Sequence, residues 1–383
     1  MSELMNKSDR GGIRQQLLST ASAFALLASI CIASETKAAD DDADRPTVWI
    51  ELGAEMDRVT GQGDAFKPGF LSVYPDSSVL QNPSPAQAQN PSPFAFGVDS
   101  RISFQPEASD WVFAASVRYG HSNSDKQVHH QTTKVHHAKY YSGVPTTSSF
   151  LTQENFARTK VSQKESHAIL DFMAGKDVGL GMFGRNGSSI LSFGVRVAQF
   201  SSKETVDIRA RPDLQFKYVP FGSNQGIENM YFHTYHASGS SSRDFRGVGP
   251  SVSWSGSAPF IGNTQNGEIA FDWGANAALL FGRQKAHVLH QESGIYVPKS
   301  ALGRIVYGTL LYHDTGKGHR TDRTVTIPNV GGFAGLSFNF VNAKVSAGYR
   351  ADLFFNAMDV GIDKRKSATL GFYGPFASIG VGL

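Results

Sequence analysis

The sequence has very little cysteine, and outside its N-terminal segment it has no unbroken run of eighteen apolar residues. The single cysteine, Cys31, lies in a segment that we expect to be removed, so the rest of the chain is predicted to contain no disulfide or cysteine-ligated metal. Without a long apolar run, a helical membrane protein is excluded. The net charge of only +3 argues against a nucleic-acid partner.

The N-terminal segment has the layout of a secretory signal peptide. Lys7, Arg10 and Arg14 form a basic region, and the apolar stretch 21–33 that follows is too short to span a membrane. Small residues then allow cleavage after Ala38. We therefore predict a cleaved signal peptide at 1–38 and one mature domain at 39–383, which keeps 32 basic and 30 acidic residues.

The stretch Thr47–Arg58 alternates between apolar and polar residues one at a time. Val48 and Ile50 belong to the apolar row, whereas Glu51 and Glu55 belong to the polar row. Only a strand, in which successive side chains point to opposite faces, separates such rows. The pattern recurs in segments of roughly ten residues, which is the length of a tilted strand that crosses a membrane. Together with the signal peptide, it predicts an outer-membrane β-barrel of a Gram-negative bacterium.

About ten antiparallel strands are predicted in this way. They lie around Thr47–Arg58, Phe94–Gln105, Trp111–Tyr119, His167–Ala174, Leu191–Val197, Val248–Ser255, Ile269–Leu279, Gly332–Phe340, Lys344–Leu353 and Ser367–Leu383. Pro375 indicates a bulge or a break in the last ladder, because proline has no amide hydrogen to donate. The segment 204–246 could form a further hairpin, which would give twelve strands.

The lengths of the connections support a transmembrane barrel over a secreted sandwich or propeller. Long segments (60–93, 121–165, 204–246, 287–330, 356–366) alternate with short ones (106–110, 178–188, 259–267, 341–342). Transmembrane barrels have long extracellular loops and short periplasmic turns. Aromatic residues near strand ends also fit the two interfacial girdles of such a barrel; they are Trp49, Phe94, Trp111, Tyr119, Trp254, Phe281 and Tyr373.

Four segments in the second half of the chain resemble the Legionella-type major outer membrane proteins, a family of pore-forming barrels. The segments are Asp244–Trp254, Asp272–Lys285, Gly348–Asp359 and the final stretch Phe372–Leu383. The resemblance covers about half the chain and rests on dispersed strand residues. It implies an outer-membrane pore, and it implies no catalytic residue.

No motif predicts an enzyme or a cofactor. Gly179, Gly181 and Gly184 match the dinucleotide fingerprint, but a strand instead of a helix is predicted after them, so we expect a turn. No nucleophile elbow and no H-E-x-x-H helix is present. The segment 121–165 contains His121 and two histidine pairs, at 129–130 and 136–137. Imidazoles suit zinc or copper, but a solvated polar loop is the simpler interpretation of this segment.

The inward row of the barrel is the predicted functional surface. In a pore, opposed rows of charge select ions and small polar solutes. Ten to twelve strands lie between a filled barrel and an aqueous channel, so two functions stay open. The first is a diffusion pore for small polar solutes, with a mild preference for cations; the second is a plugged structural or adhesive barrel that acts through its extracellular loops. The predicted lumen-facing residues are Glu51, Glu55, Asp57, Asp99, Arg101, Arg118, Asp171, Arg196, Asp272, Asn276, Lys344, Arg350 and Asp352. Outer-membrane lipid is the expected surrounding partner, and the oligomeric state is left open.

Overall fold

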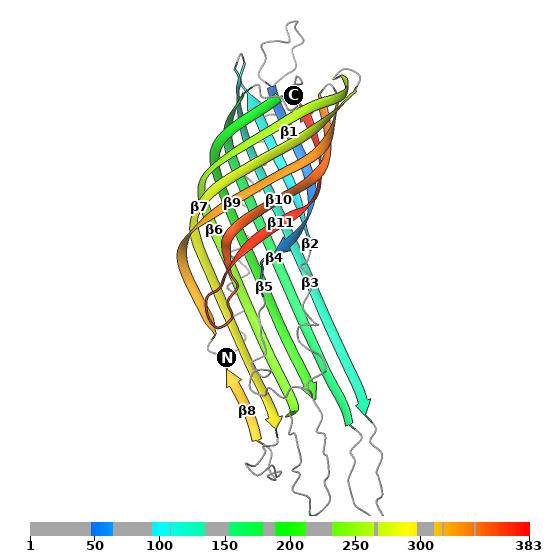
Figure 1. Cartoon of the computed structure of the whole chain (residues 1–383), viewed down its shortest axis with the longest axis vertical. Coiled ribbons are helices and arrows are strands. Elements are labelled where there is room, and N and C mark those ends of the chain that lie inside the picture. The colour runs from blue at the N-terminus through cyan, green and yellow to red at the C-terminus, as the bar shows by residue number, and fades with distance from the viewer. Residues whose placement is uncertain are drawn as a thin grey trace, which may run out of the picture. The chain divides into compact units, whose positions relative to one another are not determined.

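The computed structural model describes residues 47–63, 94–107, 109–134, 153–178, 188–211, 232–263, 267–296, 310–315, 318–340 and 342–383. Within these ranges the chain forms strands joined by turns, bends and irregular segments (Figure 1). The strands are β1 Thr47–Thr60, β2 Phe94–Gln105, β3 Trp111–Lys134, β4 Gln153–Asp177, β5 Ser188–Arg211, β6 Phe232–Asn263, β7 Gly267–Tyr296, β8 Leu310–Thr315, β9 His319–Phe340, β10 Ala343–Asp359 and β11 Ser367–Gly382. The described residues include no helix long and apolar enough to cross a membrane.

Ten of these strands close a barrel. Each pairs antiparallel with its neighbours in the order β6-β5-β4-β3-β2-β1-β11-β10-β9-β7, and β6 also pairs with β7, which closes the ring. The short β8 pairs with the far end of β7 and lies outside the ring. The predicted fold class, an all-β transmembrane barrel of about ten antiparallel strands, is confirmed.

The outer surface carries an apolar belt, which we define as the row of outward residues on each strand that are apolar and exposed. On β5 these are Phe193, Val195 and Val197. On β10 they include Val345 and Leu353. Exposed apolar residues in a closed ring are expected where lipid replaces water as the surrounding solvent.

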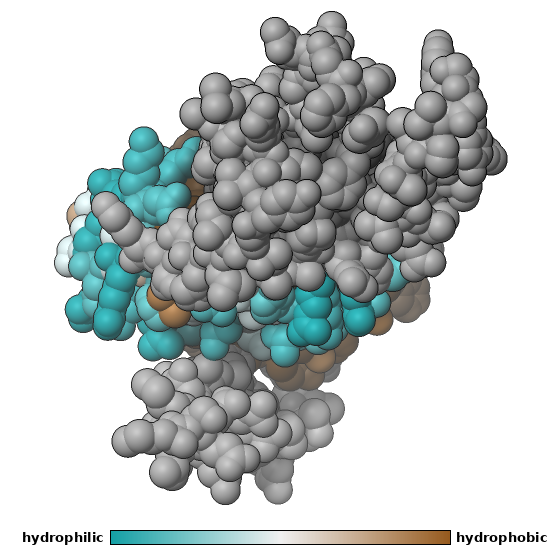
Figure 2. All heavy atoms as spheres, turned by 90° about the horizontal axis from the view of Figure 1, so that it is seen from below, coloured by the Kyte–Doolittle hydropathy of each residue, from teal (hydrophilic) through white to brown (hydrophobic). Residues whose placement is uncertain are grey.

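The ring has two different ends. At the short-connection end, where β1 begins and β11 ends, β9 ends at Phe340 and β10 begins at Ala343 (Figure 1). At the opposite, long-connection end, β3 to β7 and β9 continue past the apolar belt. There the outward row becomes polar, with Gln199 and Lys203 on β5 and Arg320 and Asp322 on β9. Seen from this end, hydrophilic residues make up much of the nearer described surface (Figure 2).

The prediction that segments 121–165, 204–246 and 287–330 are long connections between strands is therefore partly wrong. Most of their described residues belong to strands that extend the barrel beyond the belt. The predicted alternative of twelve strands is also wrong, because segments 205–210 and 235–240 pair with each other as the continuation of β5 and β6. The strands continue past the edge of the apolar belt, but their outward row is polar there. The alternation of apolar and polar residues that predicts a strand therefore ends before the strand does.

Pro375 does interrupt a ladder. The pairs between β1 and β11 run from Trp49 with Gly382 to Glu55 with Phe376, and they resume only at Arg58 with Tyr373. On its other side Pro375 stays in register with β10. The predicted break is thus confirmed, and it interrupts only the pairing of β11 with β1.

Several predictions fall outside the described residues. These are the signal peptide at 1–38, most of the connection 60–93, the glycine motif at 179–184 and the histidine pair at 136–137. Of the other histidines, His121 and His129 lie on β3 with exposed side chains.

Candidate functional site: the barrel lumen

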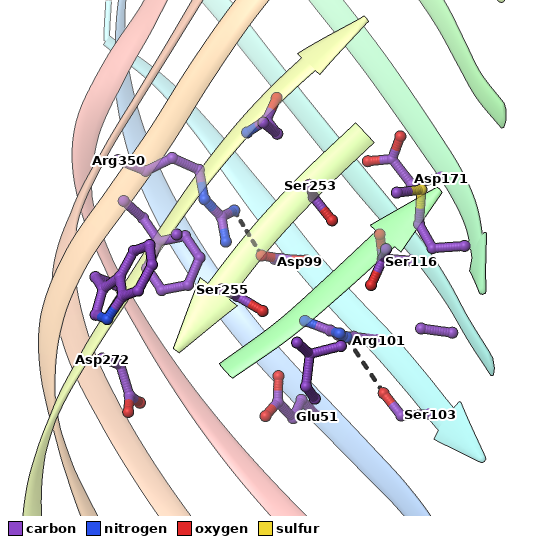
Figure 3. Close-up of a pocket in the computed structure, with 18 of the residues that line it drawn as sticks. Glu51, Asp99, Arg101, Ser103, Ser116, Asp171, Ser253, Ser255, Asp272 and Arg350 are labelled. Carbon is purple, nitrogen blue, oxygen red and sulfur yellow. Dashed lines mark hydrogen bonds and ion pairs between the residues drawn. The ribbon is translucent and has the colours of Figure 1, made fainter. Parts of the chain in front are cut away.

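The half of the lumen near the short-connection end contains a cavity of about 470 Å³. All of the predicted lumen-facing residues except Glu55 and Asp57 line it; these two are buried farther along β1. Figure 3 shows Glu51, Asp99, Arg101 and Arg350 among the residues around this cavity. The inward and outward rows therefore lie where the period-two pattern placed them, whereas a role in solute passage stays a prediction.

Small side chains keep this half hollow. At the cavity the inward row of β6 is Ser251, Ser253, Ser255 and Ser257, so the inward side chains of this strand are all hydroxymethyl groups there. Neighbouring strands add further small residues to the lining: Gly53, Ser103, Ser116, Ser192, Gly274, Ser346 and Ser378. A ten-stranded ring whose wall carries such side chains leaves space that larger residues would fill.

Most of the charges around the cavity are paired across the lumen or between strands. Lys344 Nζ lies 2.6 Å from Asp272 Oδ2. Arg196 donates to both carboxylate oxygens of Asp171, at 2.7 and 2.9 Å, and also to Asn276. Such pairs cancel much of the field that unpaired charges would set up, and they hold the walls together.

Arginines on β3 and β10 cross the lumen to reach acids on distant strands. Arg118 on β3 donates to Asp352 on β10 at 2.6 Å, and Arg350 on β10 donates to Asp99 on β2 at 2.6 Å. Arg101 differs, because its hydrogen bond goes to Ser103, two residues away on the same strand. The cross-lumen bonds connect strands that are three or four places apart in the ring, so they make the charged row a structural support.

Beyond the cavity, a buried charged layer crosses the lumen. We define it as Glu55, Asp57, Glu165 and His167 together with Arg118, Arg350 and Asp352, which border the cavity. His167 is 1% exposed, and its Nδ1 lies 3.1 Å from Glu165 Oε1. Its Nε2 faces Asp57 Oδ2 at 3.6 Å and Glu55 Oε1 at 3.8 Å. The inward order on β1 places this layer directly between the cavity and Val59.

An aromatic layer follows, which we define as Phe200, Phe245, Phe354 and Phe372. Each of these inward side chains is at most 1% exposed. They pack with other buried apolar residues: Val59, Ala95, Ile169, Ala198, Ala278, Leu280, Ile327, Ala357, Met358 and Leu370. The lumen of this barrel therefore contains a hydrophobic core.

The rings of the aromatic layer come from opposite walls and meet in the middle. The ring centroid of Phe200 on β5 lies 4.5 Å from that of Phe354 on β10 and 5.4 Å from that of Phe372 on β11. Strands β5 and β11 are five places apart in a ring of ten, which is the greatest separation possible. The described rings thus pack against one another across the lumen at this level.

Past the aromatic layer, in the extension, the buried carboxylate of Asp359 has hydrogen-bond partners within the barrel. Asp359 accepts hydrogen bonds from His319, Thr321 and the backbone amides of Gly361 and Lys366, at 2.9 to 3.2 Å. Burial alone would raise the pKa of the Asp359 carboxyl group, but these donors outweigh it and lower the pKa below its ordinary value. Asp359 therefore fixes the turn that joins β10 and β11.

Sequence reasoning missed the aromatic residues of the inward row. Trp49 was assigned to an outer girdle, which is wrong: its indole lines the cavity and donates to Glu51 at 3.1 Å. Phe333 and Phe376 also line the cavity, with ring centroids 5.9 and 5.0 Å from the guanidinium of Arg350. The sequence does indicate an inward position for Trp49, because Trp49 is two residues from the inward Glu51 and side chains two apart in a strand point to the same face.

Comparisons with known proteins give only distant likenesses. No family model matches the chain, and no curated protein matches it. Among solved structures, the transport unit of the autotransporter AIDA-I from Escherichia coli has 5% identity and a TM-score of 0.20, over 94% of this chain and 97% of that one. OmpT of Vibrio cholerae has 8% identity and a TM-score of 0.15, over 91% and 100%. The toluene transporter TodX of P. putida has 9% identity and a TM-score of 0.12, over 90% of each chain. Likenesses this weak carry no functional argument, and the resemblance to the Legionella-type family stays a prediction.

Proposed function

We propose that this protein is an outer-membrane barrel whose lumen is closed to free diffusion and whose function is carried by its extracellular end. The apolar belt supports placement in a bilayer, since outward apolar rows about ten residues long suit a tilted transmembrane strand. In this orientation the short-connection end faces the periplasm and the extension stands above the outer leaflet.

The aromatic layer is the observation that carries the proposal. Four phenylalanines from β5, β6, β10 and β11 are buried in the lumen, and the charged layer below them is bonded across the barrel. Solutes and hydrated ions would have to displace a packed apolar layer, and dehydrating a charge is costly. A barrel whose lumen is closed at this level instead suits the presentation of its extracellular end to a partner outside the cell.

A diffusion pore is the second candidate, and the cavity is the observation in its favour. Its charged and polar lining near the periplasmic end is the kind of surface that selects small polar solutes. On this alternative the aromatic layer is a gate that opens by rearrangement of Phe200 and its partners. No catalytic role is proposed for either candidate.

Planar-bilayer recording of the refolded protein separates the two candidates. We expect no steady conductance from the unaltered protein and stable channels from the double variant Phe200→Ala with Phe372→Ala. The variant Phe193→Ala, which changes an outward phenylalanine of the same β5, serves as the control and should stay closed. Steady conductance from the unaltered protein would favour the pore and overturn the closed barrel.

A further inference from the structure

We infer that Glu55, Asp57 and His167 form a binding site for one divalent transition-metal ion, such as zinc, inside the barrel. One ligand atom from each residue lies within 4.8 Å of the other two, and all three side chains are buried. The two carboxylates come from β1 and the imidazole from β4, three places away in the ring. The site is independent of whether the lumen conducts.

The three facing atoms have no hydrogen-bond partners. Glu55 Oε1, Asp57 Oδ2 and His167 Nε2 are buried and unsatisfied. Their separations from Nε2, 3.6 and 3.8 Å, are too long for hydrogen bonds, which span about 2.7–3.2 Å. They are close to the separation of roughly 3.4 Å that bonds of about 2.0–2.2 Å give neighbouring ligands in a tetrahedral zinc site. The geometry thus points to an ion between them.

The surroundings of His167 match those of a metal ligand. Its other ring nitrogen, Nδ1, lies 3.1 Å from Glu165 Oε1, so a proton on Nδ1 would leave Nε2 free to bind the metal. Histidine ligands in metalloproteins commonly donate their second nitrogen to a carboxylate in this way. Gly120 on β3 makes room for the ring, because a Cβ atom there would overlap the imidazole.

The charge balance of the layer also calls for a cation. Arg118 pairs with Asp352 and approaches Glu55, and Arg350 pairs with Asp99 and Glu55. Two guanidinium groups therefore face five carboxylates, which are Glu55, Asp57, Asp99, Glu165 and Asp352. Asp99 borders the cavity, and with neutral His167 the four buried carboxylates outnumber the two guanidinium groups by two; buried charge without compensation is costly. A divalent ion would offset this surplus.

Bound metal would join β1 to β4 directly beneath the aromatic layer. The ring centroids of His167 and Phe372 are 4.2 Å apart, so an ion that fixes the imidazole also fixes one face of that layer. We therefore assign the metal a structural role. Chelation during refolding should lower the thermal unfolding midpoint.

Zinc binding to the full chain, refolded into lipid vesicles with zinc and then dialysed, tests the site. We expect one equivalent by elemental analysis, and at least tenfold weaker binding in Glu55→Gln and in Asp57→Asn. Glu165→Gln, which removes the carboxylate beside Nδ1, should weaken binding about 10–100-fold. Asp272→Asn is the matched control, because this inward acid pairs with Lys344 away from the cluster; it should bind as the unaltered chain does.

A variant with His129, His130, His136 and His137 all changed to alanine excludes binding by that histidine-rich segment. It should retain its one equivalent of zinc. X-ray absorption of the unaltered, loaded protein should show a single imidazole with oxygen ligands, which keeps the site testable where a substituted barrel fails to fold. Absence of bound zinc, its loss with the four histidines, or a spectrum with several imidazoles would overturn the site.

Discussion

The two halves of the lumen are built by the same strands, yet one is hollow and the other is filled. On β5 the inward row passes from Ser192 and Arg196 at the cavity to Phe200 in the aromatic layer, within eight residues. On β10 it passes from Ser346 to Phe354. The number of strands is the same at both levels, so strand number alone does not decide whether this barrel is open. The size of the inward side chains decides it.

The comparison also separates two uses of charge. Around the cavity, acids and bases pair along the inner wall of the barrel, and the small side chains of the lining leave the cavity open. One layer farther along, the same kinds of residue are buried beneath phenylalanines, where water does not hydrate an unpaired charge. We expect substitutions in the two halves to have different consequences, and the following predictions test that expectation in order of decreasing effect.

The largest effect is expected in the aromatic layer. Phe200→Ala should lower the free energy of unfolding by about 3–5 kcal/mol, because it removes a fully buried ring and leaves a void among Phe245, Phe354 and Phe372. Urea unfolding of the refolded barrel in lipid vesicles measures the change. Phe193→Ala, on the lipid-facing row of the same strand and 60% exposed, should cost far less. Equal losses would show that the lumen at Phe200 is not packed.

A comparable loss is expected in the charged layer. Arg118→Met should lower the free energy of unfolding by about 3–5 kcal/mol, since it leaves Asp352 and Glu55 buried with one cation fewer. Arg101→Met is the matched control, because Arg101 borders the cavity and bonds only to Ser103 in the described structure. The same unfolding assay applies. An Arg101 variant as unstable as the Arg118 variant would remove the distinction between the two halves.

The sequence predicted the barrel and the parity of its rows but not the filling of its lumen. The period-two pattern was sufficient for the fold because the bilayer imposes one apolar face on every strand. The inward row obeys no such rule. Phe354 follows Asp352 in the same row, and alternation cannot tell whether a ring at that position meets partners from the opposite wall.

The proximity of Glu55, Asp57 and His167 was not predicted from the sequence for a related reason. Glu55 and Asp57 are predicted on the inward row, and His167 shares the parity of the predicted inward Asp171. Residues 110 positions apart, however, meet only once the order of strands and their stagger around the ring are fixed. The extension was missed because its outward row is polar, as at Gln199 and Lys203, so an apolar–polar alternation no longer marks the strand. Both are tertiary effects that a pattern read along one strand does not contain.

A third experiment tests the apolar belt against the cavity wall. Ala347→Arg should cost about 2–4 kcal/mol, because Ala347 is on the outward row and an arginine there enters the bilayer. Ser346→Arg should cost less, since Ser346 lines the cavity, where the guanidinium has space and neighbouring carboxylates. The yield of folded protein in lipid vesicles compares the two. If the adjacent substitutions were equally harmful, the inward and outward rows of β10 would be misassigned.

The smallest effect is expected in the extension, where Asp359 is bonded to groups of the barrel and does not border the cavity. Asp359→Asn should lower stability at neutral pH by about 1–3 kcal/mol, because hydrogen bonds to a charged acceptor are the stronger kind. Since the folded pKa of Asp359 is lowered, its contribution is complete above the unfolded value of about 3.9 and is lost as the pH falls through the folded pKa. The difference between variant and unaltered protein should therefore shrink below about pH 4. Asp110→Asn, at a side chain that is 73% exposed and 3.4 Å from Lys176, should change stability little at any pH. A gap for Asp359→Asn that stays constant from pH 7 down to pH 2 would show that its carboxylate does not hold the turn through charge.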